Sequence, residues 1–185
     1  MKRNLISKTV FIIAAFVAVV VVVPSCDKVK DLAEFDVPYT LPDVHFTIDS
    51  VDYLPKTEQL LVQQTMTLNV DSIIQEHGLD GIGETQFEYI RLAVESPAWA
   101  NFSWLNSARV TVSAEGLSET QIAAIASISP DGRSVDLQLS NTDVSSTVST
   151  GSFTLRVYGD ITPPLPAGTI GLLLSSKIKM TVQPI

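Results

Sequence analysis

Residues 108–114, Ala108-Arg109-Val110-Thr111-Val112-Ser113-Ala114, alternate apolar and polar side chains without a break. A period of two places successive side chains on opposite faces of an extended chain, so this segment is predicted to be a strand with one buried face. The same alternation recurs on both sides of it, and a short strand over 36–40 brings the expected number to about eight. The other apolar rows are Val44, Phe46 and Ile48; Met66, Leu68 and Val70; Ile90, Leu92 and Val94; Val135, Leu137 and Leu139; Phe153, Leu155 and Val157; and Ile178, Met180 and Val182.

Three short helices are predicted between these strands, and the clearest begins at Ser118. Gln121 completes a capping box there, because serine and glutamine three residues apart can bond to each other's backbone amides. Leu117 can pack on Ile122 as a hydrophobic staple, and the helix is predicted to end near Ile128, before a proline.

The two other predicted helices lie at 71–78 and 141–151. Asp71 and Asn141 are suited to cap their first turns, and each segment ends at a glycine. Loops are predicted at the glycine-rich stretch 78–83, at Asp131-Gly132 and at the proline-rich stretch 163–166.

Many short alternating strands without a regular βαβ pattern favour two antiparallel sheets packed face to face. We therefore expect an all-β sandwich, immunoglobulin-like or jelly-roll-like, over residues 36–185, with the short helices as crossovers between strands. An open barrel is the alternative. The Cys, Trp, Cys spacing of true immunoglobulin domains is absent, because Cys26 is the only cysteine.

The N-terminal part has the pattern of an export signal. An unbroken apolar run of 14 residues, 10–23, follows three basic residues, and it is too short for a hydrocarbon core that needs about 20 residues. The run ends in Val23-Pro24-Ser25-Cys26, which resembles the lipobox of bacterial lipoproteins, although Val23 and Pro24 depart from the commonest pattern. This resemblance implies cleavage by signal peptidase II after a signal peptide at 1–25, and lipid attachment to Cys26 at the start of a tether over 26–35. Ordinary cleavage that leaves a free thiol is the alternative.

The charge balance narrows the choice of partners. Residues 1–25 contain three of the 12 basic residues and no acidic one, so the mature chain would carry nine basic against 20 acidic residues, a net charge of −11. Such a surface repels nucleic acid and gains nothing from anionic lipid headgroups. The lipid on Cys26, and not a basic patch, would therefore hold the protein to a membrane.

The sequence offers few groups for catalysis. His45 and His77 are the only histidines; His45 falls on the solvated face of its strand and His77 at the end of a predicted helix, without metal-binding spacing. No serine has the surroundings of a hydrolase nucleophile. We assign no catalytic residue, metal ligand or cofactor, although spacing alone leaves open a pair of carboxylates from distant strands, as in glycan hydrolases.

The best candidate binding surface is an aromatic cluster between two predicted strands, formed by Trp99, Phe102 and Trp104. Aromatic rings on a sandwich loop can stack on sugar faces or pack against a protein. The alternative, which we prefer, is that these rings plug the end of the core.

The chain as a whole, a signal ending in Ser-Cys followed by an acidic all-β domain, resembles the envelope lipoproteins of Bacteroidota. This resemblance implies attachment to the outer membrane through Cys26. Asp49-Ser50-Val51 and Asp71-Ser72-Ile73 also look like the acceptor used there for O-glycosylation. We expect a non-enzymatic binding or structural module for an envelope protein or a glycan, and a glycan hydrolase is the alternative.

Overall fold

The computed structural model describes residues 35–49, 58–77, 79–162 and 168–184. The predicted signal peptide, Cys26, nearly all of the tether and the predicted loop at 163–166 lie outside these residues, as does Ser50 of the first glycosylation motif. Within the described residues, no helix has the length and apolar content needed to cross a membrane.

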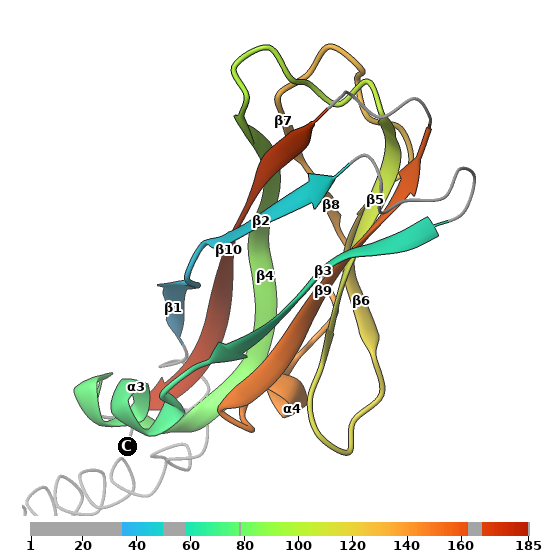
Figure 1. Ribbon diagram of the computed structural model, residues 1–185. Helices are drawn as coiled ribbons and strands as arrows, with labels where there is room; N and C mark the ends of the chain where they lie inside the picture. Colours follow the sequence, from blue (N-terminus) through green and yellow to red (C-terminus); the bar gives the residue numbers. More distant parts are fainter. Residues whose placement is uncertain (1–34, 50–57, 78, 163–167, 185) are drawn as a thin grey trace, which may run out of the picture. The chain divides into compact units, whose positions relative to one another are not determined.

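The described chain folds into two antiparallel sheets of five strands each (Figure 1). In the first sheet the order is β1-β10-β4-β7, and β2 also pairs with β10, next to β1; in the second sheet it is β3-β9-β5-β6-β8. The all-β sandwich predicted from the alternation is thus confirmed, and the barrel alternative is wrong. The elements are β1 Phe35–Thr40, β2 Val44–Asp49, β3 Glu58–Thr67, α3 Val70–His77, β4 Leu79–Ser96, β5 Leu105–Ser113, β6 Thr120–Ile125, β7 Ser134–Asp136, β8 Gln138–Leu139, α4 Ser145–Val148, β9 Ser152–Ile161 and β10 Thr169–Pro184.

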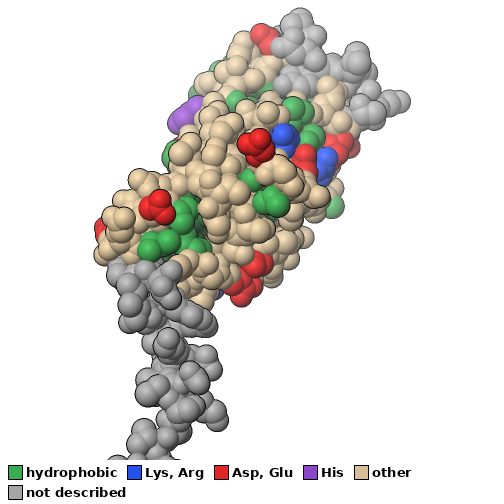
Figure 2. Space-filling model, turned by 90° about the horizontal axis from the view of Figure 1, so that it is seen from below, with side chains coloured by type: hydrophobic (Ala, Val, Ile, Leu, Met, Phe, Trp, Pro, Cys, Tyr) green, Lys and Arg blue, Asp and Glu red, His purple; other side chains and the backbone are tan. Residues whose placement is uncertain are grey.

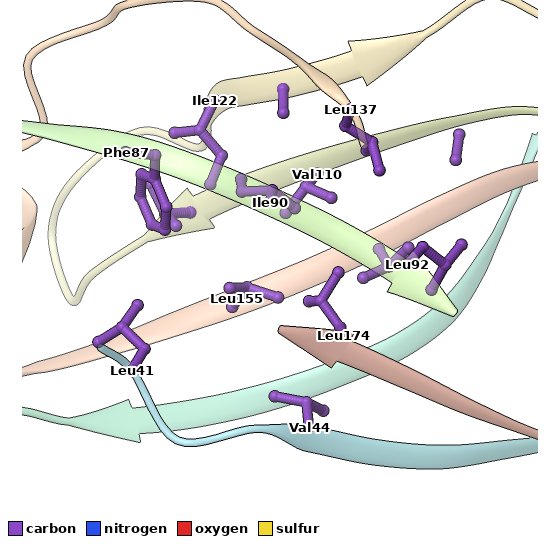
Figure 3. Packing of buried hydrophobic residues seen from close by; sticks show 14 of the residues in the cluster. Leu41, Val44, Phe87, Ile90, Leu92, Val110, Ile122, Leu137, Leu155 and Leu174 are labelled. Atoms are coloured by element: carbon purple, nitrogen blue, oxygen red, sulfur yellow. The ribbon is translucent and has the colours of Figure 1, made fainter. Parts of the chain in front are cut away.

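The core lies between the sheets and is built by the alternation seen in the sequence. Every second side chain of β9 and of β10 is buried, and the residues between them are partly exposed. Figure 3 shows Leu92 and Leu174 of the first sheet in one packed layer with Val110 and Leu155 of the second. Burial of such a side chain contributes about 1.5–3 kcal/mol, so this layer supplies much of the stability of a chain with a single cysteine.

The helix predicted over 118–128 is wrong, because this segment contains strand β6, which pairs with both β5 and β8. The Glu119 carboxylate accepts hydrogen bonds from the hydroxyls of Thr111 (2.7 Å) and Tyr158 (3.0 Å) on neighbouring strands. Ile122 is buried in the core. Pairing along β5 and burial of Ile122 therefore outweigh the local capping pattern.

The helix predicted over 71–78 is present as α3, but its cap is a different residue. The side chain of Asn69 accepts a hydrogen bond from the Ser72 amide (3.0 Å), which is the N-cap interaction, whereas Asp71 lies within the first turn. A negative charge in the first turn still interacts favourably with the helix dipole. Ser72, of the second glycosylation motif, is exposed on this turn.

The predicted helix within 141–151 is present as the single turn α4, but Asn141 does not cap it: the N-cap is Val144, which forms no side-chain capping bond. Asp143, and not Asn141, accepts hydrogen bonds from the Ser145 amide (2.9 Å) and from the Thr85 amide of β4 (3.0 Å). Burial raises the pKa of Asp143, but the hydrogen bonds from Thr85 and Ser145 outweigh it, so the pKa is lowered overall. Asp143 thus joins α4 to the first sheet.

The glycine-rich stretch 78–83, predicted to be a flexible loop, is largely strand. β4 begins at Leu79 and pairs with β10 there, with Ile82 opposite Val182. A Cβ atom at Gly83 would lie 2.9 Å from the Thr181 carbonyl oxygen, closer than such atoms normally approach. Glycine is required here because the two backbones come close together, not because the chain needs the conformational freedom of a loop.

Candidate functional site

The aromatic cluster divides between surface and core. Trp99 is 63% exposed, whereas Phe102 and Trp104 are only 1% and 0% exposed. The buried rings are tilted against each other, with centroids 6.4 Å apart. The interpretation as a binding surface is therefore wrong for Phe102 and Trp104, which plug the core as the preferred alternative predicted, and Trp99 is the ring that a partner can reach.

Trp99 lies on the connection between β4 and β5, residues 97–104, which we call the Trp99 loop. In Figure 1 this connection lies at the end of the sandwich opposite α3 and α4. The loop contains two tight turns, closed by hydrogen bonds from the Ala100 amide to the Pro97 carbonyl and from the Leu105 amide to the Phe102 carbonyl, each 3.0 Å. Its backbone is therefore paired locally and held in one conformation.

Arg133 ties this loop to the rest of the molecule. It is the last residue of the connection between β6 and β7, where the predicted turn at Asp131-Gly132 is confirmed by a hydrogen bond from the Gly132 amide to the Ser129 carbonyl. The guanidinium donates to backbone carbonyls only, and its planar fork can serve several acceptors at once. These acceptors are Val94 (3.1 Å), Glu95 (3.5 Å), Pro97 (3.1 Å), Ala98 and Ala100 (2.6 Å).

Backbone contacts complete the junction of the two connections. The Phe102 amide donates to the Gly132 carbonyl (2.9 Å), and the Val94 amide donates to the Arg133 carbonyl (2.7 Å). The sequence analysis missed Arg133, because its acceptors are 33 to 39 residues away and no local pattern marks it. The result is an exposed indole on a loop that is fixed at both ends and at its centre.

An ion pair lies where β4 leads into this loop. His45 of β2 contacts the Glu95 carboxylate at 2.8 Å, and the backbone carbonyl of Glu95 is one of the acceptors of Arg133. The hydrogen bond to Glu95 raises the pKa of His45. His45 is exposed, as predicted, and His77 ends α3. Within the described ranges, no group of three or more His, Cys, Asp or Glu is placed to hold a metal ion.

The outer face of the second sheet carries a network of charged side chains. Arg109 forms two hydrogen bonds with Glu58, of 2.5 and 2.8 Å, and stacks over the Tyr158 ring with 3.9 Å between the guanidinium carbon and the ring centre. Arg156 lies 3.4 Å from Glu119, whose pKa is lowered mainly by the hydrogen bond from a threonine hydroxyl. These contacts join β3, β9 and β5 to Glu119, the residue before β6, so these charged groups bind one another across the sheet.

Every lysine and arginine of the described residues contacts an acceptor within the protein. There are six, and five of them contact a carboxylate, whereas Arg133 contacts carbonyls. In Figure 2 the blue side chains visible from below accordingly lie beside red ones. The carboxylate pairs are Arg91 with Asp136 (2.6 Å), Arg109 with Glu58 (2.5 Å), Arg156 with Glu119 (3.4 Å), Lys177 with Glu88 (2.8 Å) and Lys179 with Asp36 (3.1 Å).

These pairs also set the acidity of the carboxyl groups. Hydrogen bonds from Arg91 and Lys179 lower the pKa of Asp136 and of Asp36, respectively. Together with Glu119 and Asp143, these are the described carboxyl groups with a clear shift, and all four shifts are downward. A general acid in glycan hydrolysis needs the opposite, a raised pKa.

Comparison with known proteins adds little to this geometry. No family model matches the sequence, and no curated protein matches it. Solved structures with some similarity include turnip yellow mosaic virus (13% identity, 80% of this chain and 96% of that chain, TM-score 0.23) and desmodium yellow mottle tymovirus (10% identity, 82% of each chain, TM-score 0.24). TM-scores this low carry no argument about fold or function.

Proposed function

We propose that this protein is a lipid-anchored lipoprotein of the cell envelope whose sandwich is a non-enzymatic binding or structural module for a protein or glycan partner. The observation that carries the binding role is the exposed indole of Trp99, which is held in place by Arg133. A large ring presented on a fixed loop contacts a partner without the entropic cost of ordering the loop. This combination is typical of a recognition site.

The proposed anchor is lipidated Cys26, and the proposed site of attachment is the outer membrane. The support is the sequence alone, a short apolar run that ends in a lipobox-like Val23-Pro24-Ser25-Cys26. Several acyl chains on one cysteine bury enough methylene groups for stable attachment, whereas one chain holds a protein only marginally. The hydrolase alternative would need a carboxyl group with a raised pKa as its general acid, and the four described carboxyl groups with a clear shift all have a lowered pKa.

The anchor is tested by fractionation of cells that produce wild-type protein or Cys26→Ala. Wild-type protein should sediment with membranes and require detergent for release, and the variant should be found in the soluble fraction. Protease shaving of intact cells then tells whether the wild-type domain faces outward. Sedimentation of Cys26→Ala with the membranes, to the same extent as wild type, would contradict the lipid anchor.

The binding role is tested with envelope fragments from cells that lack the protein. The full chain with Cys26→Ala should bind these fragments saturably, and Trp99→Ala in the same background should weaken binding by at least about tenfold. Leu117→Ala is the matched control, because Leu117 is also apolar and exposed but lies in the turn between β5 and β6. Equal binding of the Trp99→Ala and Leu117→Ala proteins would refute the assigned site.

A further inference from the structure

We propose that the Trp99 loop binds a neutral glycan, with one pyranose ring stacked on the exposed face of the Trp99 indole and with Arg133 as the positioning residue. This inference rests on the proposed function and specifies its ligand. Within the described part of the chain, four observations carry it: the single large exposed apolar side chain of the loop, the polar residues of the same loop, the engagement of every described Lys and Arg, and the bonds that hold the loop backbone.

Among the described residues, Trp99 is the one large exposed apolar side chain of its loop. The other large exposed apolar side chains among the described residues are Phe35, Leu60, Tyr89 and Leu117, and none of them belongs to the Trp99 loop or to the connection between β6 and β7 that is bonded to it. A stable protein interface buries about 800 Å² on each partner around an apolar centre. A single ring in polar surroundings instead matches the size and the apolar C–H face of one sugar ring.

The neighbours of Trp99 in the loop supply hydrogen-bonding groups for hydroxyls. Ser103 is exposed and Asn101 is half-buried. The side-chain oxygen of Asn101 accepts a bond from the Ser103 amide (3.2 Å), and its NH₂ group has no partner within the described ranges. A loop that carries an exposed indole and, two and four residues later, amide and hydroxyl groups fits a ligand with an apolar face and a polar rim.

The charges around the loop select a neutral ligand. Among the described cations, Arg133 is the one that contacts the Trp99 loop, and it donates to backbone carbonyls of that loop. The other charged side chains next to the loop are Glu95 on β4, which contacts His45, and exposed Asp131 on the bonded connection. Because the other five described cations each contact a carboxylate, none is available to pair with an acidic sugar.

Arg133 contributes to binding by holding the backbone of the loop in position, and it does not contact the sugar. Its guanidinium holds the carbonyls of Pro97, Ala98 and Ala100, on both sides of Trp99. A loop fixed in this way loses little conformational entropy when the ligand stacks. Replacement of Arg133 by lysine keeps the charge but removes the fork, so we expect weaker binding from a domain that is still folded.

The test is calorimetric titration of the purified full chain carrying Cys26→Ala. The probes are cellohexaose, maltohexaose, mannohexaose and xylohexaose, with hexagalacturonate as the anionic control. At least one neutral hexasaccharide should bind, and an increase in salt from about 50 to about 500 mM should change its affinity less than about twofold. Absence of binding by all four, or tighter binding of hexagalacturonate, would overturn the inference.

Variants assign the binding to the loop. Trp99→Ala should weaken it by at least about tenfold, Trp99→Phe by less, and Leu117→Ala not at all. Arg133→Lys should weaken it by about threefold or more while the near-ultraviolet circular dichroism of the buried aromatic residues is unchanged. Equal affinity of the Trp99→Ala and wild-type proteins would refute the stacking.

The same variants separate this inference from the proposed function. If envelope fragments bind in a manner that depends on Trp99 but no neutral hexasaccharide binds, the glycan is wrong and the site stands. Loss of that binding after protease treatment of the fragments would then identify a protein partner. If binding to the fragments is unaffected by Trp99→Ala, the site itself is wrong.

Discussion

Replacement of Arg133 by methionine tests how firmly the Trp99 loop is held. Methionine keeps an unbranched chain but removes all donors, so five backbone carbonyls lose their bond to the guanidinium, and the Pro97 carbonyl keeps only its bond from the Ala100 amide. Water can replace the donor at the exposed carbonyls but less easily at the three part-buried ones, those of Val94, Pro97 and Ala100. A hydrogen bond to a charged group contributes about 1.5–3 kcal/mol, and these three share one side chain, so we expect a loss of about 2–4 kcal/mol.

The assay is urea denaturation followed by far-ultraviolet circular dichroism, from which the free energy of unfolding is extrapolated. The matched control is Arg91→Met. Arg91 and its partner Asp136 are 54% and 63% exposed, so solvent screens this pair and it contributes little to stability. If Arg133→Met costs no more than Arg91→Met, Arg133 does not hold the loop, and the argument for a fixed Trp99 fails.

Three further predictions concern the core and two titrating groups. Trp104→Ala should cost about 3–5 kcal/mol in the same assay, because this indole is fully buried. The hydrogen bond from Thr111 lowers the pKa of Glu119. The Glu119 carboxylate therefore stabilises the fold above its ordinary pKa of 4.5, and this stabilisation is lost as the pH falls through the lowered pKa. Glu119→Gln should accordingly lose less thermal stability in acid than the wild type does. The hydrogen bond to Glu95 raises the pKa of His45. The contact between the two side chains therefore stabilises the fold fully below pH 6.5, and this stabilisation is lost as the pH rises through the raised pKa. An NMR titration should find a lower His45 pKa in Glu95→Gln than in the wild type.

The strands were predictable because burial on one face leaves a regular record in the sequence. The rows at Ile90, Leu92 and Val94 and at Leu155 and Val157 are buried as predicted. The order of strands in each sheet was not predictable, because it depends on pairing between distant segments. β10 lies between β1 and β4, for example, although the chain reaches it last.

The errors share a physical cause, namely local signals that tertiary contacts overrule. The segment Thr120–Ile125 contains two adjacent alanines, which fit a helix as well as a strand, and a capping pattern precedes it. Glu119, the residue before this segment, favours the strand, because its carboxylate accepts hydrogen bonds from hydroxyls on β5 and β9. The prediction of a flexible loop at Gly83 is wrong for the same reason. Glycine is needed there because Thr181 on β10 comes close to it, and this contact is not visible in the local sequence.

The candidate site shows the same division between local and distant information. The sequence located the aromatic cluster but could not tell which ring is exposed, because Trp99 and Trp104 occur in similar local surroundings. What distinguishes them is the position of the loop backbone, which Arg133 fixes from another connection. Motifs for recognition sites of this kind are therefore incomplete without the residue that holds the loop.

The distribution of charge connects the acidic composition to the proposed ligand. The six described cations cross-link strands or hold one loop, and acidic residues outside these pairs, such as Asp71, Glu115 and Asp131, are exposed. An anionic partner would then meet repulsion and find no unpaired cation in the described part of the chain, whereas a cationic protein would be attracted in a manner that weakens with salt. A neutral glycan would meet neither effect. The dependence of affinity on ionic strength therefore distinguishes the three classes of partner before any of them is identified.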